Sequence, residues 1–337
     1  MIKIGQVGIC HEHAAGKIRA LRKLPEVFEI VGVVDDRESA AARFAGNNLE
    51  AYEGLKWLTE EDLFATPGLQ AVAVETPNAD LVSTAARCME RGLAVHMDKP
   101  GGEDMDRFRA LREAFAQRNL PFQMGYMFRG NPAIQFCRTA VRENRLGDVF
   151  EIEASMSHDY GGEVYQRYLA RFKGGIMFNL GCHLIDLVLP MLGRPRTIAP
   201  FINSTAGAAA GAFNNCLCIL GYPHATVTLR ACDMEMDGIS QRRLKICGTE
   251  GTIDLCPLER FDGKPLQMQL RLKRGNAEYA AGTHTVDFGV QEDRYTGQLL
   301  ELARLIRGEI GNPYTCEHDC LVQEVLLAAS GYTEWKG

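Results

Sequence analysis

The sequence predicts an α/β protein in two parts: a doubly wound parallel sheet, followed by an α+β domain with a large, mostly antiparallel open sheet. Over residues 1–125, short apolar segments alternate with amphipathic ones, which is typical of a parallel sheet with helices on its faces. From residue 126 onward, strand-like segments follow one another with few helices between them. The length of 337 residues supplies enough core for two domains.

Composition excludes several classes of protein. Hydrophobic residues make up 46% and charged residues 24% of the chain, as in ordinary globular proteins. The net charge of -6, without a dense stripe of Lys and Arg, argues against nucleic acid as a partner. No apolar run reaches the ~18–20 residues of a membrane span, and the chain opens directly into a predicted strand. The 11 scattered cysteines predict buried, reduced thiols and a cytoplasmic protein.

Strands and helices alternate in the first part. Pro25 closes the first helix and Gly92 the second, since proline cannot continue a helix and glycine favours its end. We expect strands at residues 2–8, 28–34, 71–75, 93–97 and 121–125, and helices at 14–24, 81–91 and 105–118.

Strands dominate the second part. Gly248–Gly251 predicts a hairpin turn, and Ala206–Ala212 a mobile loop. We expect helices on one face of the sheet, while the other face joins subunits into a homodimer or homotetramer. The predicted strands are 149–157, 215–220, 225–232, 243–247, 252–255 and 268–272, and the predicted helices are 132–144, 174–186, 296–307 and 319–332.

The turn that begins at Gly8 is the candidate binding loop for a dinucleotide. It keeps the first glycine of a G-x-G-x-x-G fingerprint, but Cys10 and His13 occupy the places of the other two. The helix that follows offers N–H groups to a pyrophosphate. Asp35 ends the second strand, where a carboxylate binds ribose hydroxyls and repels a 2′-phosphate, which favours NAD over NADP. A plain turn at Asp35-Asp36 is the alternative.

Cysteines and histidines raise the question of a metal. Cys10, His11 and His13 resemble a ligand cluster, and Cys316 and Cys320 are spaced like a metal-binding pair. The first group lacks a fourth ligand and would compete with a phosphate, and the second lacks another pair. We therefore expect no metal.

Two further segments carry polar groups in apolar surroundings. Lys99 follows a buried strand at the edge where α/β sheets bind ligands, and Pro100 keeps the preceding backbone extended. A cation there can stabilise negative charge on a hydroxyl or carbonyl. Asn179, His183 and Asp186 are spaced by four and three residues, so they share one helix face. Such a stripe forms either a polar core network or the wall of a ligand site.

Four segments form an ordered set along nearly the whole chain: Thr76-Pro77-Asn78, Gly92–Pro100, Gly125–Pro132 and Gly174–Asp186. Together they resemble the glucose-fructose oxidoreductase / inositol dehydrogenase (Gfo/Idh/MocA) family of NAD(P)-dependent sugar and polyol dehydrogenases. The resemblance implies a dinucleotide-binding Rossmann domain over residues 1–125. It also implies a substrate-binding and oligomerisation domain over 126–337, with the last helix packing back on the first domain.

The resemblance also implies hydride transfer between a secondary hydroxyl and NAD. Lys99 would orient the substrate, and His183 would be the general base, since its ordinary pKa is near neutrality. Asn179 would stand one turn before that base. The cofactor residues would be Gly8, Ile9, Cys10, His13, Asp35, Thr76, Pro77, Asn78, Asp98 and Lys99. Tyr126 and Arg129 would stand near the substrate, and Asp186 would hold either the substrate or its own helix. His158 and Tyr160 end a predicted strand that could also reach the substrate, with ordinary polar positions at the surface as the alternative.

Three residues depart from the family pattern. Asn179 replaces the usual aspartate, Leu81 a common histidine, and Asp98 a glutamate. A neutral amide can orient the histidine but cannot supply the charge that stabilises an imidazolium. Two other functions therefore stay open: a dinucleotide-dependent sensor with little turnover, and an NAD-dependent glycoside hydrolase or lyase.

Overall fold

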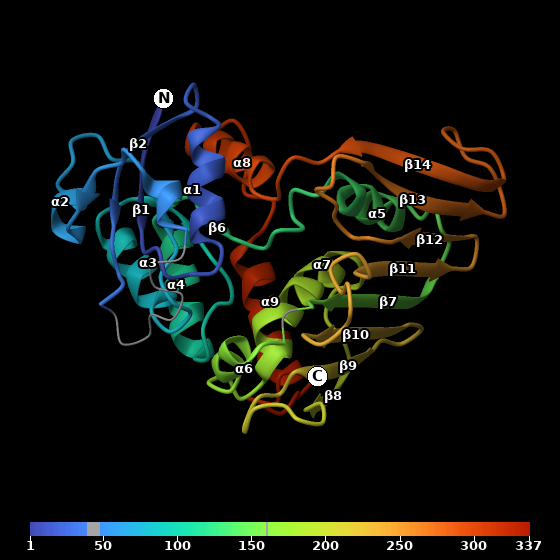
Figure 1. The fold of residues 1–337 in the computed structure, drawn as a ribbon. Helices are drawn as coiled ribbons and strands as arrows, with labels where there is room; N and C mark the ends of the chain where they lie inside the picture. Colours follow the sequence, from blue (N-terminus) through green and yellow to red (C-terminus); the bar gives the residue numbers. More distant parts are fainter. Residues whose placement is uncertain (39–47, 160) are drawn as a thin grey trace. The chain divides into compact units, whose positions relative to one another are not determined.

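The chain forms two structural units (Figure 1). The computed structural model describes residues 1–38, 48–159 and 161–337. The first unit comprises Met1–Met127 and Asp293–Gln323, and the second comprises Phe128–Glu292 and Glu324–Gly337. Each unit therefore contains two separate stretches of the chain.

The first unit is built on a six-stranded parallel sheet with the order β3-β2-β1-β4-β5-β6. The chain moves outward from β1 to β3 and then returns to the other side of β1, so the sheet is doubly wound, as predicted. The carboxyl ends of β1, β4 and β5 consequently meet at one edge. The strands are β1 (Ile2–Val7), β2 (Phe28–Val34), β3 (Trp57–Leu58), β4 (Ala71–Val74), β5 (Ala94–Met97) and β6 (Phe122–Met124).

Helices bury the faces of this sheet. Ile18 and Leu21 of α1 share one apolar cluster with Leu299 and Leu302 of α8, so a late stretch of sequence completes the core of the first unit. The helices are α1 (Ala14–Arg22), the 3-10 turn η1 (Leu49–Tyr52), α2 (Glu60–Phe64), α3 (Leu81–Glu90), α4 (Met105–Gln117) and α8 (Thr296–Ile306). β3, α2 and η1 were not predicted, because elements this short carry no readable periodicity.

The second unit contains an eight-stranded sheet with the order β14-β13-β12-β11-β7-β10-β9-β8. β7 and β10 are parallel, and the other neighbours are antiparallel, which confirms the predicted sheet. β11 and β12 pair through the hairpin that was predicted. The strands are β7 (Val149–Ser157), β8 (Thr197–Asn203), β9 (Asn215–Gly221), β10 (Thr226–Cys232), β11 (Arg243–Gly248), β12 (Gly251–Leu255), β13 (Pro265–Leu272) and β14 (Gly282–Val290).

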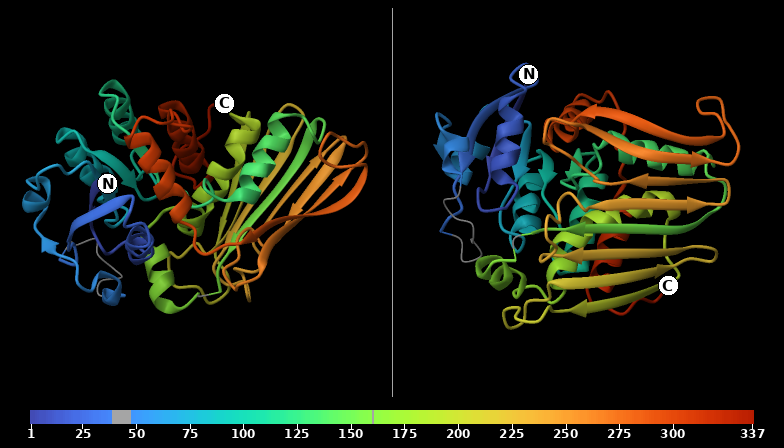
Figure 2. Two further views of the ribbon diagram at one scale, coloured as in Figure 1. Left: turned by 90° about the horizontal axis from the view of Figure 1, so that it is seen from above. Right: turned by 45° about the vertical axis from the view of Figure 1, so that its right-hand side comes forward.

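One face of this sheet carries helices. α5 and α7 contact it, and Ile152, Ala154 and Met156 of β7 are buried beneath them, while alternate residues are half-exposed. No helix of the described chain lies across the opposite face (Figure 2). The helices are α5 (Pro132–Arg142), α6 (Glu163–Leu169), the π turn η2 (Met177–Gly181) and α7 (Cys182–Leu192). α9 (Cys316–Ala329) begins in the first unit and ends in the second, since the boundary falls after Gln323.

Three elements of the second unit, β8, β14 and α6, were not predicted from the sequence. β8 contains Pro200, and β14 is mostly polar and exposed, so neither shows the alternation of a half-buried strand. α6 is only seven residues long. Among the described residues, no helix is long and apolar enough to cross a membrane.

Candidate active site

The carboxyl edge of the parallel sheet begins with a tight turn at Gly8. Its φ is 94°, and a Cβ there would lie 2.6 Å from the backbone nitrogen of Thr76. Only glycine accommodates both constraints. This close approach places Thr76-Pro77-Asn78, which follows β4, beside the loop that follows β1.

Part of the loop's hydrogen-bonding capacity is used within the protein. The N–H groups of Ile9 and Cys10 donate to Asp36 Oδ1 at 2.8 and 3.1 Å. Those of Ala15 and Gly16, in the first turn of α1, have no intrahelical acceptor and suit a phosphate. The residues present thus fit a dinucleotide at the start of α1 rather than at the loop itself.

Asp35 and Asp36 have different surroundings. Asp35 is at the surface, where its carboxylate accepts hydrogen bonds from Arg37, which lower its pKa. Burial raises the pKa of Asp36. Burial, together with Asp36, also raises the pKa of the Cys10 thiol to about 12, so this cysteine stays protonated. The accessible carboxylate is therefore Asp35, the residue predicted to face a ribose.

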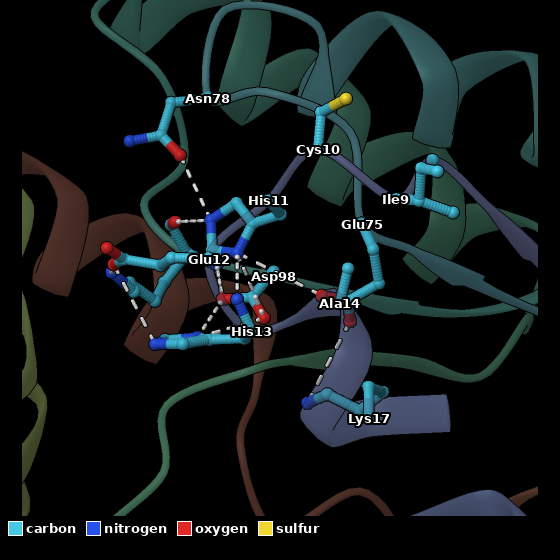
Figure 3. A network of polar contacts seen from close by, with 12 residues as sticks. Ile9, Cys10, His11, Glu12, His13, Ala14, Lys17, Glu75, Asn78 and Asp98 are labelled. Carbon is cyan, nitrogen blue, oxygen red and sulfur yellow. Dashed lines mark hydrogen bonds and ion pairs between the residues drawn. The ribbon is translucent and has the colours of Figure 1, made fainter. Parts of the chain in front are cut away.

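A buried polar network lies beneath the loop (Figure 3). His13 Nδ1 is 3.0 Å from Asp98 Oδ1, and His11 Nδ1 is 3.6 Å from Asp98 Oδ2. Burial lowers the pKa of His11 to about 4. Burial acts to raise the pKa of Asp98, but His11, His13 and Lys17 outweigh it and hold that pKa well below the usual range. Asp98 is thus a buried carboxylate surrounded by nitrogen atoms.

Lys99 is held by the same network. Its side chain is fully buried, and its Nζ donates to Glu12 Oε1 at 2.9 Å. Burial acts to raise the pKa of Glu12, but Lys99 and the two histidines of the loop lower it to about 2. The backbone oxygen of Lys99 and Asn78 Oδ1 both contact His11 Nε2, at 3.2 and 3.0 Å. The structure therefore brings Asn78, Asp98 and Lys99 together, as the sequence predicts.

In the second unit, Asn179 makes hydrogen bonds to two tyrosine hydroxyls. Its amide nitrogen donates to the Tyr165 hydroxyl at 3.1 Å, and its oxygen accepts from the Tyr168 hydroxyl at 3.1 Å. The His158 ring lies edge-on to Tyr165, and His158 Nδ1 accepts from Arg242 at 2.8 Å. A connected polar cluster thus joins α6, the π turn and the end of β7.

The other two residues of the predicted polar helix face, His183 and Asp186, have different surroundings. Asp186 is fully buried, and Arg129 Nε and Nη2 donate to its Oδ1 at 3.0 and 2.6 Å, with Arg138 at 3.7 Å from Oδ2. His183 is also buried and packs edge-on against Phe128. Asp186 and Arg129 therefore form an ion pair with each other, which joins α7 to the start of α5.

Other predicted residues are placed as follows. Tyr126 is buried in the first unit, where its backbone oxygen accepts from Gln298 at 2.6 Å. Tyr160 lies outside the described residues. Five residues of these polar clusters were not predicted, because none of them belongs to a recognisable motif. They are Tyr165, Tyr168, Arg242, Glu12 and Glu75. Buried polar residues in apolar runs were the only available signal, and Glu75 after β4 was the clearest case.

Two regions of the chain match sequence models of known domains. Residues 2–126 match an oxidoreductase family with an NAD-binding Rossmann fold, and residues 134–254 match the GFO/IDH/MocA C-terminal domain. The chain belongs to the Gfo/Idh/MocA family. The fold and the resemblance predicted from the sequence are thereby confirmed.

Individual members of the Gfo/Idh/MocA family are distant from this chain. Rhizopine catabolism protein MocA of Rhizobium meliloti is 24% identical over 214 residues, 63% of each chain. Inositol 2-dehydrogenase of Rhizobium meliloti strain 1021 is 27% identical over 197 residues, which are 58% of this chain and 54% of that protein. The matches thus span less than two thirds of these curated relatives.

A solved structure extends the likeness over the whole chain. Levoglucosan dehydrogenase, in complex with NADH and levoglucosan, aligns with a TM-score of 0.75 at 15% identity. The alignment covers 98% of this chain and 97% of that one. It shows the same fold in both units.

Proposed function

We propose that the protein is an NAD-dependent dehydrogenase that acts on a secondary hydroxyl of a sugar, polyol or related small molecule. The observation that carries the proposal is the carboxyl edge of the parallel sheet, where the Gly8 turn follows β1 and the buried Lys99 follows β5, on either side of β4. The family supports it, since relatives named for inositol and levoglucosan are dehydrogenases. Fold alone does not fix a reaction, so the site residues must be tested.

The dinucleotide would be held at the start of α1. Ala15 and Gly16 would donate N–H groups to its pyrophosphate, and Asp35 would accept hydrogen bonds from a ribose. A free ribose is favoured over a 2′-phosphate because Asp35 is negative, although Arg37 beside it is positive. NAD is therefore favoured over NADP. When bound, this cofactor supplies the carbon that accepts hydride.

The protein's own part is to position a hydroxyl and to accept its proton. Lys99 would stabilise the negative charge that develops on the hydroxyl oxygen, with Glu12 fixing its ammonium group. His183 would take the proton as general base. Asn179 would position Tyr165 and Tyr168, while Asp186 and Arg129 hold α7 in place.

Replacing the base tests this proposal. His183→Ala is expected to lower kcat for NAD reduction by about 10²- to 10⁴-fold on a polyol or sugar that the wild type oxidises. His224→Ala, an exposed histidine between β9 and β10, is the matched control and should retain full activity. Circular dichroism would establish that both variants fold. Undiminished turnover in His183→Ala would refute the role of this residue.

A sensor function is the second candidate. Asp36 occupies two N–H groups of the loop after β1, and Asn179 has no charge with which to stabilise an imidazolium. Tight binding of NAD without any turnover on a broad panel of sugars and polyols would support it over the dehydrogenase.

We also propose a homodimer or homotetramer in the cytoplasm. The uncovered face of the antiparallel sheet carries Phe201, Leu217 and Ile219 on two paired strands, and none of them is buried. A second copy of that face would cover them. The cysteines of the described chain are free thiols, in keeping with a reducing compartment.

A further inference from the structure

His11 presents a nitrogen lone pair to the centre of the buried network. Its Nε2 contacts the backbone oxygen of Lys99 at 3.2 Å, and a carbonyl oxygen can only accept, so Nε2 carries the proton. Its Nδ1 accepts from the backbone N–H of His13 at 3.2 Å, which is consistent with that tautomer. Nδ1 is therefore an unprotonated, electron-donating atom.

Two carboxyl groups face the same nitrogen. Asp98 Oδ2 is 3.6 Å and Glu75 Oε2 is 3.9 Å from His11 Nδ1, and both side chains are fully buried (Figure 3). No hydrogen-bond donor of the described residues reaches either carboxyl oxygen of Glu75. Lys17 lies 3.9 Å from the other oxygen, Oε1, and leaves Oε2 directed toward the histidine. Three electron-rich atoms thus converge where only a shared proton or a cation can separate them.

We propose that His11, His13 and Asp98 bind a divalent transition-metal ion of the Zn²⁺ type, with Glu75 as a fourth ligand. One potential ligand atom of each of the first three residues lies within 4.8 Å of the others. Tetrahedral zinc ligands are about 3.4 Å apart, given Zn–N and Zn–O distances near 2.1 Å. His13 Nδ1 lies 3.0 Å from Asp98 Oδ1, while His11 Nδ1 lies 3.6 Å from Asp98 Oδ2 and 3.9 Å from Glu75 Oε2. The two histidines thus meet different oxygens of Asp98, and the side chains must move to bring four ligand atoms around one ion.

Imidazole and carboxylate ligands suit this class of ion better than Ca²⁺ or Mg²⁺, which prefer oxygen alone. The ion would bind the lone pair of His11 Nδ1, which accepts a hydrogen bond from the His13 N–H. It would then tie the loop after β1 to the ends of β4 and β5. The sequence could not show this site, because the ligands that the loop lacks come from residues 75 and 98.

The test is metal binding by the intact protein without dinucleotide or substrate, so its outcome is independent of the proposed dehydrogenation. Protein freed of metal with a chelator and kept reduced is titrated with Zn²⁺ in a calorimeter and with Co²⁺ in a spectrophotometer. We expect one equivalent per chain and a rise in Tm with Zn²⁺. Thiolate ligation, by contrast, would show as a charge-transfer band in the near-ultraviolet spectrum of the Co²⁺ complex.

Three variants locate the ion. His13→Gln affects a partly exposed side chain and should fold, and it should weaken binding at least tenfold. His11→Gln and Glu75→Gln should also weaken binding, and His224→Gln is the control, with unchanged affinity. Absence of stoichiometric binding, equal affinity in His13→Gln and wild type, or a thiolate band in the Co²⁺ complex would overturn the proposal.

Discussion

Asp233 is a buried carboxyl group that follows β10 in the second unit. Burial raises its pKa from 3.8 to about 6. Because the folded-state pKa lies above the unfolded one, its contribution to stability is complete below about pH 4 and is lost as the pH rises through about 6. The ionised form is thus a cost that the folded protein carries at neutral pH.

Asp233→Asn should remove this cost. We expect the variant to gain up to about 2 kcal/mol over wild type at pH 8 and to gain much less at pH 4. The two tryptophans lie in different units, so urea unfolding in a Trp57→Phe background reports on the second unit through Trp335. Glu334→Gln, an exposed carboxyl change in the same unit, is the control. A gain that does not depend on pH would contradict the prediction.

Residues within recognisable motifs could be predicted, and their partners could not. Asp98 and Lys99 were predicted at the sheet edge because they follow a strand, and Asn78 was assigned to the cofactor by the family resemblance. In the structure, all three contact His11 of the buried polar network. Glu12 and Glu75 join that network through side-chain geometry alone. The role of Asp186 was left open between helix and substrate, and its partner Arg129 is more than fifty residues away in sequence.

At the scale of elements, the start of the helix that carries His183 is determined by Gly175. The helical segment follows Gly175, whose φ is 48° and where a Cβ would lie 2.0 Å from the Phe213 backbone oxygen. The first turn after it is a π turn over Met177–Gly181. The sequence predicted a helix from the glycine pair but no π turn, since periodicity does not distinguish one wide turn within a short segment.

Gly175→Ala should destabilise the second unit strongly. Both the backbone conformation and the space forbid a side chain, so we expect a loss of about 3 kcal/mol. Gly331→Ala, after α9, meets only the strain of a φ of 72° and should lose about 1 kcal/mol. Urea unfolding measures both variants, and equal losses would show that the contact with Phe213 is unimportant.

At the scale of the whole molecule, the types of the two sheets were the most predictable feature. The alternation of strand and helix patterns predicted the parallel sheet, and a turn signal predicted the pairing of β11 with β12. β8 and β14, the two edges of the larger sheet, were missed because an edge strand need not alternate. The uncovered sheet face leads to the remaining prediction.

Phe201→Glu should separate the proposed oligomer. Phe201 pairs with Leu217 on the uncovered face and is 48% exposed. A charge there would be buried without a partner in the assembly, so the dissociation constant should rise at least tenfold. Leu300→Glu on α8, 40% exposed, is the control. Light scattering during gel filtration gives the mass, and an unchanged mass for Phe201→Glu would refute this interface.

The contribution of α8 to the first unit affects the order of events during synthesis. The ribosome releases β1 to β6 early, but the apolar cluster around α1 lacks Leu299 and Leu302 until residues 293–323 emerge. This cluster therefore remains incomplete while more than 160 residues of the second unit are made. During that interval the nascent chain is a natural client for a chaperone, and its last helices complete the first domain as well as the second.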